Sequence, residues 1–301
     1  MRIISRPDFD GVVCVVLLKA ALGDASDVRW TQPSEIQNGR FRLLPGDVVA
    51  NLPLGDEDVG MWFDHHVSNV SEKIHEGLFR IAPSAAGLIY EYYQAYFQDK
   101  WQGRFAELVR ETDKIDSAQL SLDEILYPQS YPYVLLSMSI PTRRSLEDAD
   151  YCDHLVDLIG ALEIDGVMAD PRVERRCENV VIANQVYERM LREDTYMDGH
   201  VSVTDFRGVS PVPDGNRFLV YSLFPDALVN VKLYDEGPHV VVKLGHSILN
   251  RGCRVNVGKL LARYGGGGHR GAGACRLERG RSRVDIENII SILRKNISNE
   301  A

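Results

Sequence analysis

The sequence lacks paired cysteines and long apolar runs, and each absence excludes a class of protein. Its five cysteines, an odd number, form no Cys-x-x-Cys pair, which argues against a disulfide framework and against a zinc ribbon. We therefore expect reduced thiols and a cytoplasmic protein, because disulfides are rare in that compartment. No apolar run reaches membrane-spanning length, and the N-terminal residues show no signal-peptide pattern. A membrane is not an expected partner.

Positive charge is also scarce. The 34 lysine and arginine residues are outnumbered by 43 aspartate and glutamate residues, which gives a formal net charge of -9. Binding of long duplex nucleic acid requires a broad basic surface, so we do not expect such a partner. A small phosphorylated ligand in a local basic pocket is compatible with this charge. The P-loop pattern and the dinucleotide fingerprint after a first strand are both missing as well.

What the sequence does contain is centred on residues 59–66. An apolar run, Val59–Phe63, stops abruptly at Asp64, His65 and His66, and we interpret the run as a strand with these polar residues at its tip. In an open α/β sheet, ligands bind just outside the carboxyl ends of the strands. The alternative is a surface cluster, or a core histidine that is bonded to an aspartate.

Two other predicted strands end in a similar way. Arg2–Ser5 is followed by Asp8 and Asp10, and Asp47–Ala50 is followed by Asn51. Because the carboxyl ends of parallel strands meet at one edge of a sheet, we expect these side chains near the tip of Val59–Phe63.

A further acidic group, Glu111–Asp116, follows a predicted helix that begins near residue 103. Carboxylates and imidazoles that converge in this way are ligands for divalent metals. Oxygen ligands favour Mg²⁺ or Mn²⁺, and mixed imidazole and carboxylate sites favour Mn²⁺, Fe²⁺, Co²⁺ or Zn²⁺. The sequence therefore predicts a metal centre at this edge.

The order of the elements predicts an α/β fold class. Strands alternate with helices in the first half, including an apolar helix over 12–22 and a helix that Ser84 caps, which predicts a parallel sheet with right-handed crossovers. Short strands in the second half predict a smaller C-terminal α+β domain with a mainly antiparallel sheet. The expected domains are 1–145, a helical connection at 146–198, and 199–301. The strands expected in the last domain are Val201–Thr204, Phe218–Tyr221, Leu228–Val231 and His239–Val242.

A glycine-rich segment follows a predicted helix from Val257 to Arg263. Glycines let backbone N–H groups approach an anion closely, and a histidine and an arginine add donors and charge. The alternative is a flexible linker, but the segment continues into another predicted strand at 272–277. The residues expected to hold a phosphate are Gly266, Gly267, Gly268, His269 and Arg270.

Together these motifs resemble the DHH phosphoesterase family, in the branch that carries the DHH-associated C-terminal domain and includes exopolyphosphatase-related and oligoribonuclease-like proteins. The resemblance covers nearly the whole chain, with N-terminal motifs between residues 7 and 116 and a Gly-Gly-Gly-His motif at 266–269. It implies two metal ions, often Mn²⁺, on either side of a water that attacks phosphorus.

The resemblance also implies a role for each motif residue. Asp64 would orient an imidazole, and His66 would face the phosphate. The implied catalytic residues are Asp8, Asp10, Asp64, His65, His66 and Asp113. The implied metal ligands are Asp8, Asp10, His65 and Asp113, with Asn51 at the position of a fifth.

Two departures from the family pattern concern the same metal. Ile4 stands where a histidine is common, and Asn51 stands where an aspartate usually bridges both ions, although an amide still offers a neutral oxygen. We therefore expect one or two ions. Arg6 lies two residues before Asp8, and a guanidinium binds carboxylate or phosphate in a fork. We expect Arg6 to replace part of the weakened metal, either by pairing with Asp8 or by reaching the substrate phosphate. The alternative is a side chain that points to solvent.

The resulting prediction is a metal-dependent phosphoesterase that uses Mn²⁺ or Mg²⁺. Its substrate would be a small nucleotide or short oligonucleotide, bound in a cleft between two domains. One alternative is a catalytically weakened relative that binds a phosphorylated ligand as a sensor or scaffold, which Ile4 and Asn51 favour. The other is an exopolyphosphatase-like hydrolase, against which stands the lack of a long basic track.

Overall fold

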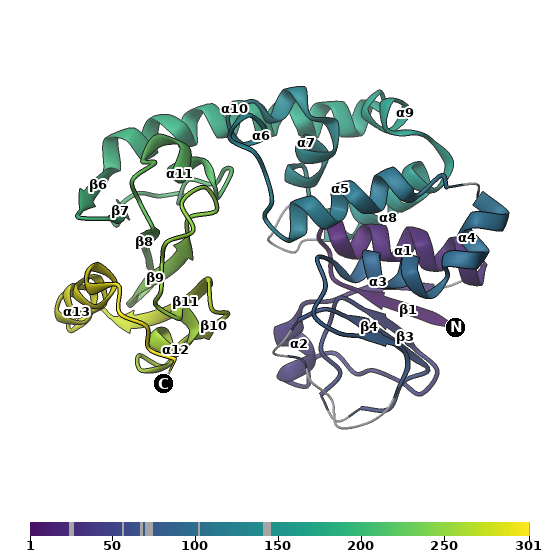
Figure 1. The fold of residues 1–301 in the computed structure, drawn as a ribbon, viewed down its shortest axis with the longest axis horizontal. Helices are drawn as coiled ribbons and strands as arrows, with labels where there is room; N and C mark the ends of the chain where they lie inside the picture. The colour runs from purple at the N-terminus through teal and green to yellow at the C-terminus, as the bar shows by residue number, and fades with distance from the viewer. Residues whose placement is uncertain are drawn as a thin grey trace. The chain divides into compact units, whose positions relative to one another are not determined.

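The computed structural model describes residues 1–23, 27–55, 57–66, 69, 75–101, 103–140 and 146–300. The chain forms two compact units, coloured from purple to teal and from green to yellow in Figure 1. Unit 1 comprises Met1–Gln119 and Gln129–Glu178, and unit 2 comprises Leu120–Pro128 and Asn179–Ala301. The expected boundary at 145 lies outside the described residues. The expected helical connection at 146–198 is divided between the units within one long helix, and the three-part division stays a prediction.

Unit 1 is built on a five-stranded parallel sheet, which confirms the predicted fold class of the first half. The strand order is β2-β1-β3-β4-β5, and each described pair of neighbours runs parallel. Short apolar segments, buried on both faces, form the central strands, as is usual for parallel sheets. The strands are β1 (Arg2–Ser5), β2 (Asp27–Trp30), β3 (Val48–Ala50), β4 (Met61–Asp64) and β5 (Glu76–Phe79).

Helices cover both faces of this sheet (Figure 1). On one face α1 contacts β1 and β3 beneath it and α3, α5 and α8 beside it, so nearly its whole circumference is buried, as its continuous apolar run predicts. On the other face Ile36 of α2 joins an apolar cluster with Ile4, Val49 and Trp62. The helices are α1 (Phe9–Leu22), α2 (Pro33–Gln37), α3 (Ala85–Tyr92), α4 (Gln94–Trp101), α5 (Ala106–Asp116), α7 (Pro132–Met138), α8 (Leu146–Ala161), α9 (Ile164–Met168) and α10 (Pro171–Asp194).

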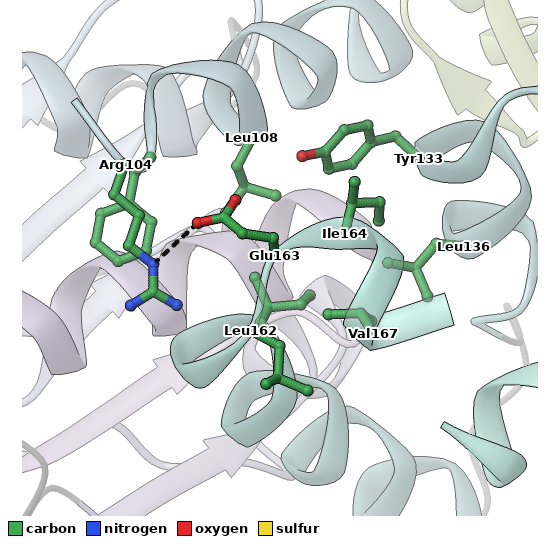
Figure 2. A pocket seen from close by; sticks show the side chains of 10 residues that line it. Arg104, Leu108, Tyr133, Leu136, Leu162, Glu163, Ile164 and Val167 are labelled. Atoms are coloured by element: carbon green, nitrogen blue, oxygen red, sulfur yellow. Dashed lines mark ion pairs between the residues drawn. The ribbon is translucent and has the colours of Figure 1, made fainter. Parts of the chain in front are cut away.

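A small pocket opens among the helices of unit 1 (Figure 2). Its walls are mainly apolar side chains, such as Leu108, Leu136 and Val167. At its rim Arg104 and Glu163 pair with each other at 4.0 Å. None of the residues that the sequence analysis selected lines this pocket.

Unit 2 contains a six-stranded sheet with the order β10-β11-β9-β8-β7-β6. Among the described pairs, β7 and β8 run parallel and the others run antiparallel, which confirms the mainly antiparallel prediction. The strands are β6 (Thr195–Asp198), β7 (Val201–Phe206), β8 (Val229–Glu236), β9 (His239–His246), β10 (Gly267–Gly268) and β11 (Ala272–Glu278). The helices are α6 (Leu122–Leu126), α11 (Leu219–Leu223), α12 (Val257–Ala262) and α13 (Ser282–Lys295), besides the second part of α10.

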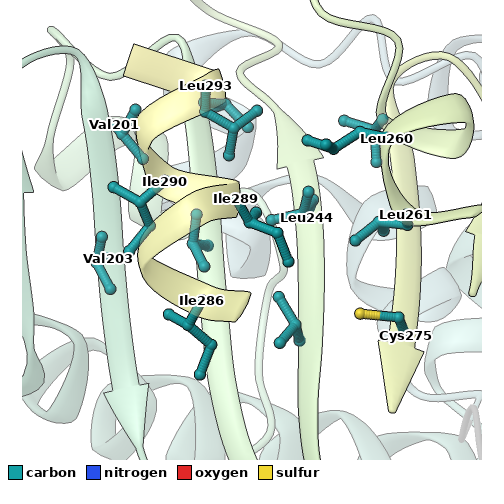
Figure 3. Close-up of a cluster of buried hydrophobic side chains, with 14 of the residues drawn as sticks. Val201, Val203, Leu244, Leu260, Leu261, Cys275, Ile286, Ile289, Ile290 and Leu293 are labelled. Carbon is teal, nitrogen blue, oxygen red and sulfur yellow. The ribbon is translucent and has the colours of Figure 1, made fainter. Parts of the chain in front are cut away.

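One face of this sheet forms the core of unit 2. Alternate residues of β7, including Val201 and Val203, point towards α13, where Ile286 and Ile290 meet them (Figure 3). All four side chains are buried. The alternation of valine with polar residues over Val201–Thr204 follows from the twofold period of a strand, and it ends at Asp205 and Phe206.

The strand predicted at Phe218–Tyr221 is wrong, because this segment is the helix α11. Asn216 starts the turn: its Oδ1 accepts a hydrogen bond from the N–H of Phe218 at 3.0 Å, and its carbonyl accepts one from the N–H of Leu219 at 3.0 Å. Leu219, Val220 and Tyr221 are all buried. A short apolar run that is buried all round has no period to distinguish a helix from a strand.

Two further findings concern the cysteines and the search for a membrane-spanning helix. Each of the five cysteines is buried and carries a free thiol. In the part of the chain that the structure describes, no helix is both long and apolar enough to span a bilayer.

Candidate metal centre

The carboxyl ends of three strands of unit 1 lie side by side. Ser5 at the end of β1 is the register partner of Ala50 in β3, and Ala50 is the partner of Phe63 in β4. The polar residues that follow each strand therefore meet at one edge of the sheet. This edge carries Arg6, Asp8, Asp10, Asn51, Asp64, His65 and His66.

The innermost group at this edge consists of Asp10, His65 and Asp116. Nε2 of His65 lies 3.7 Å from Oδ2 of Asp10 and 3.3 Å from Oδ2 of Asp116. Nδ1 of His65 lies 3.0 Å from the carbonyl oxygen of Ala82, and if it donates its proton there, the lone pair stays on Nε2. Nε2 is buried and has no hydrogen-bond partner among the described residues. A buried lone pair beside two carboxylates is a donor set for a divalent cation.

Asp10 is held by the first turn of α3. Its Oδ2 accepts a hydrogen bond from the N–H of Ala85 at 3.0 Å, and its Oδ1 accepts one from the N–H of Ala86 at 2.8 Å. Burial and the charge of Asp8 raise the pKa of Asp10 to about 7, against the effect of these bonds. Burial likewise raises the pKa of Asp116, and the charge of Asp10 adds to it. Repulsion between buried carboxylates is what a bound cation would relieve.

Asp64 organises the two histidines. It is fully buried, and its Oδ1 accepts hydrogen bonds from the backbone N–H of His65 at 2.9 Å and from Nδ1 of His66 at 2.7 Å. Burial lowers the pKa of His66, but the hydrogen bond to Asp64 and its charge outweigh burial and raise the pKa overall. His66 is therefore fixed in orientation and biased towards the protonated form that would attract a phosphate.

Asp8 occupies a different position from Asp10. It caps the N-terminus of α1, where its Oδ1 accepts a hydrogen bond from the N–H of Gly11 at 2.9 Å. The same oxygen accepts a second bond from Nδ2 of Asn51 at 3.0 Å. Oδ2 of Asp8 pairs with Nε of Arg6 at 3.0 Å. The carboxylate of Asp8 thus contacts two other selected residues, Arg6 and Asn51.

Asp113 and Asp116 lie one turn apart on α5 and have different neighbours. Oδ1 of Asp113 accepts a hydrogen bond from Oγ of Ser84 at 2.6 Å, and Ser84 also caps α3 as predicted. Asp116 is the residue beside Nε2 of His65. The sequence analysis identified the acidic group 111–116 but selected Asp113 by its match to the family motif. The spacing of three residues, which places both aspartates on one side of a helix, was the available signal for Asp116.

The glycine-rich segment is part of the fold of unit 2. Gly267 and Gly268 form β10, which pairs with Gly273 and Ala274 of β11. The N–H of His269 donates to the carbonyl of Ala272 at 2.7 Å, which closes a tight turn.

The other side of this turn rests on α12. The N–H of Gly258 donates to the carbonyl of His269 at 2.9 Å, and a Cβ on Gly258 would lie 2.3 Å from the carbonyl oxygen of Gly268. Arg270 pairs with Glu300 at 2.7 Å. The predicted cleft between this segment and the metal centre stays a prediction.

The similarity of this chain to known proteins was found among solved structures. No family model matches the sequence, and no curated protein matches it. Among solved structures, the pGpG-specific phosphodiesterase PggH from Vibrio cholerae is similar over 97% of this chain and 98% of its own, with 28% identity and a TM-score of 0.79.

Two more distant structures share the fold. RecJ from Thermus thermophilus in complex with Mn²⁺ matches 98% of this chain, but this chain spans only 52% of RecJ, with 14% identity and a TM-score of 0.60. An exopolyphosphatase-related protein from Bacteroides fragilis matches 98% of this chain and 92% of its own, with 11% identity and a TM-score of 0.59. These likenesses extend over both units, and the Asp-His-His motif ends a strand at the edge where the acidic residues meet. The chain therefore has the fold of the DHH-family phosphoesterases that are its structural neighbours.

Proposed function

We propose that the protein is a metal-dependent hydrolase that cleaves a phosphate ester bond in a small nucleotide or short oligonucleotide. The observation that carries the proposal is the buried, unpartnered Nε2 of His65 between the carboxylates of Asp10 and Asp116. The similarity to PggH, which is described as a pGpG-specific phosphodiesterase, supports linear dinucleotides as the first substrate class to examine.

The donor set fits a divalent cation. Asp10 and Asp116 supply oxygen and His65 supplies nitrogen, a mixture that Mn²⁺ accepts and Mg²⁺ accepts less readily. When bound, such an ion would polarise a phosphate oxygen and lower the pKa of a coordinated water. RecJ from Thermus thermophilus has been solved in complex with Mn²⁺ and in complex with Mg²⁺, which supports a divalent ion for the fold.

The other residues at the edge would act on the substrate. His66, held by Asp64 at 2.7 Å, would donate a hydrogen bond to a phosphate oxygen. We assign the remaining phosphate contacts to unit 2, where His269 and Arg270 provide side-chain donors and positive charge next to the glycine segment. A variant His269→Ala should then raise KM with little change in kcat, because that contact is made in both the ground state and the transition state.

The test is a substrate screen of the purified protein with Mn²⁺. The compounds are pGpG and other linear dinucleotides, 3′-phosphoadenosine 5′-phosphate, cyclic dinucleotides and polyphosphate. We expect hydrolysis of a linear dinucleotide to mononucleotides and loss of that hydrolysis in His65→Ala. Turnover that His65→Ala leaves unchanged would contradict the proposed metal chemistry.

Two other functions give different results in the same screen. A sensor or scaffold, which Asn51 in place of an aspartate favours, would bind a nucleotide without turnover. A polyphosphatase would release inorganic phosphate. Polyphosphate is included because the chain shares its fold with an exopolyphosphatase-related protein. The five free, buried thiols support the further proposal that the protein works in the reducing cytoplasm.

A further inference from the structure

Both oxygens of the Asp8 carboxylate already have partners within the protein. An ionised carboxylate oxygen has about two lone-pair sites, and Oδ1 of Asp8 accepts hydrogen bonds from the N–H of Gly11 at 2.9 Å and from Nδ2 of Asn51 at 3.0 Å. Oδ2 faces Nε of Arg6 at 3.0 Å. A metal ion on Oδ1 would have to break the cap of α1 or the bond from Asn51, and one on Oδ2 would lie close to the permanent cation of Arg6, which would repel it.

The turn that presents Arg6 to Asp8 is rigid. The N–H of Asp8 donates to the carbonyl of Arg6 at 2.9 Å. A Cβ on Gly11 would lie only 1.9 Å from that same carbonyl oxygen, so only glycine allows the first turn of α1 to pack there. Backbone geometry therefore places Arg6 and Asp8 close together, and their side chains pair through Nε of Arg6.

With an asparagine at position 51, no second cation is required beside Asp8. It is 2% exposed and sits at the end of β3 with a left-handed φ of 58°, a conformation that asparagine tolerates well. A carboxylate at the position of its Nδ2, 3.0 Å from Oδ1 of Asp8, would repel Asp8 unless a cation lay between them. The amide converts that repulsion into a hydrogen bond.

The charges balance with a single divalent ion. Asp8 is neutralised by Arg6, and Asp10 and Asp116 together carry the two negative charges that face Nε2 of His65. Oδ1 of Asn51 is buried without a hydrogen-bond partner among the described residues. It is a neutral oxygen that a water or an ion could use.

From these contacts we propose that the centre holds one divalent ion, on Asp10, His65 and Asp116, and that the guanidinium of Arg6 takes the place of a second. Besides Asp8, the described part of the chain contains no ion-pair partner of Arg6, and the side chain is 38% exposed. Its Nη groups can therefore bind a phosphate oxygen of the substrate in a fork. This substrate role rests on the proposed function, whereas the number of ions does not.

The decisive experiment counts Mn²⁺ on the intact protein. Calorimetric titration should give one tightly bound ion per chain, and electron paramagnetic resonance should give the spectrum of isolated Mn²⁺. The double variant Arg6→Ala, Asn51→Asp should bind a second ion, and its spectrum should show coupling between the two. Ile4 is left unchanged because it packs in the apolar cluster with Val49 and Trp62.

Two tightly bound, coupled ions in the unmodified protein would overturn the proposal. That measurement requires no variant, so a misfolded variant cannot mask the result. It also requires no substrate, so the ion count stays decisive even if the substrate screen finds no hydrolysis.

The role of Arg6 towards substrate has a separate readout. Arg6→Ala should lower kcat/KM by about 100-fold, the usual effect of losing one charge-stabilising donor, and added guanidinium ion should restore part of the rate. The matched control is Arg29→Ala, which removes an exposed arginine that also pairs at 3.0 Å with an aspartate two residues away. Equal rates for Arg6→Ala and the unmodified enzyme, or equal losses in both variants, would contradict the assignment.

Discussion

At the scale of single residues, neighbouring carboxylates differ because their surroundings differ. Asp8 and Asp10 are two positions apart, yet Asp8 is bonded by Gly11, Asn51 and Arg6, while Asp10 is buried beside His65. Asp113 and Asp116 form a second such pair, in which the first is bonded by Ser84 and the second lies against His65. In each pair, the aspartate whose oxygens face a bare imidazole nitrogen is the one that we propose as the metal ligand.

This comparison predicts a difference between two conservative variants. Asp116→Asn should weaken Mn²⁺ binding by about 10- to 100-fold or more, since even loss of an outer contact has that effect. Asp113→Asn keeps an oxygen that can accept the hydrogen bond from Ser84, so this variant should weaken Mn²⁺ binding less than Asp116→Asn does. Calorimetric titration of both variants with Mn²⁺ measures the difference. A larger loss of Mn²⁺ affinity in Asp113→Asn than in Asp116→Asn would indicate that Asp113 is the ligand.

At the scale of elements, the metal centre depends on how helices begin. Ser84 caps α3 by accepting the N–H of Gly87 at 2.9 Å, and it donates to Asp113 at 2.6 Å. The two following N–H groups hold Asp10. A cap of this kind contributes about 0.5–2 kcal/mol to stability, and here it also fixes the donors that position a ligand.

Ser84→Ala should therefore reduce both stability and metal affinity. We expect a loss of about 1 kcal/mol in the free energy of unfolding and a weaker Mn²⁺ titration, because the first turn of α3 becomes free to move away from Asp10. Ser121→Ala is the matched control, since Ser121 caps α6 of unit 2 in the same way. The control should lose stability alone. Equal Mn²⁺ affinity in the two variants would show that the cap and the metal centre are independent.

Sequence reasoning succeeded where a local pattern determines an element. The strands that end at Asp64 and before Asn51, and the cap at Ser84, could be predicted because each follows from a few adjacent residues. It failed at Phe218–Tyr221, where burial on all sides removes the period that identifies a strand. The spacing of Asp113 and Asp116 places both on one side of α5, but which of them lies beside His65 could not be predicted, because that depends on how α5 packs against α1 and α3.

At the scale of the whole molecule, the two units have separate cores. The core of unit 2 lies between its sheet and α13, and that of unit 1 surrounds α1. The proposed ligands Asp10, His65 and Asp116 all belong to unit 1. Metal binding should therefore stabilise unit 1 directly.

Thermal unfolding in the presence and absence of Mn²⁺ tests this assignment. A ligand that binds only the folded state stabilises it by about 2.7 kcal/mol at a concentration of 100 times Kd, so Mn²⁺ should raise the Tm and a chelator should reverse the effect. Two spectroscopic signals separate the stabilisation of unit 1 from that of the whole chain. Tryptophan fluorescence, including that of Trp30 and Trp62, reports on unit 1, because the tryptophans of this chain all lie there. Far-ultraviolet circular dichroism reports on both units. His269→Ala should keep the full Mn²⁺-dependent shift in tryptophan fluorescence, and His65→Ala should lose it. A shift that survives in His65→Ala, or one that His269→Ala removes, would place the ion outside the group formed by Asp10, His65 and Asp116.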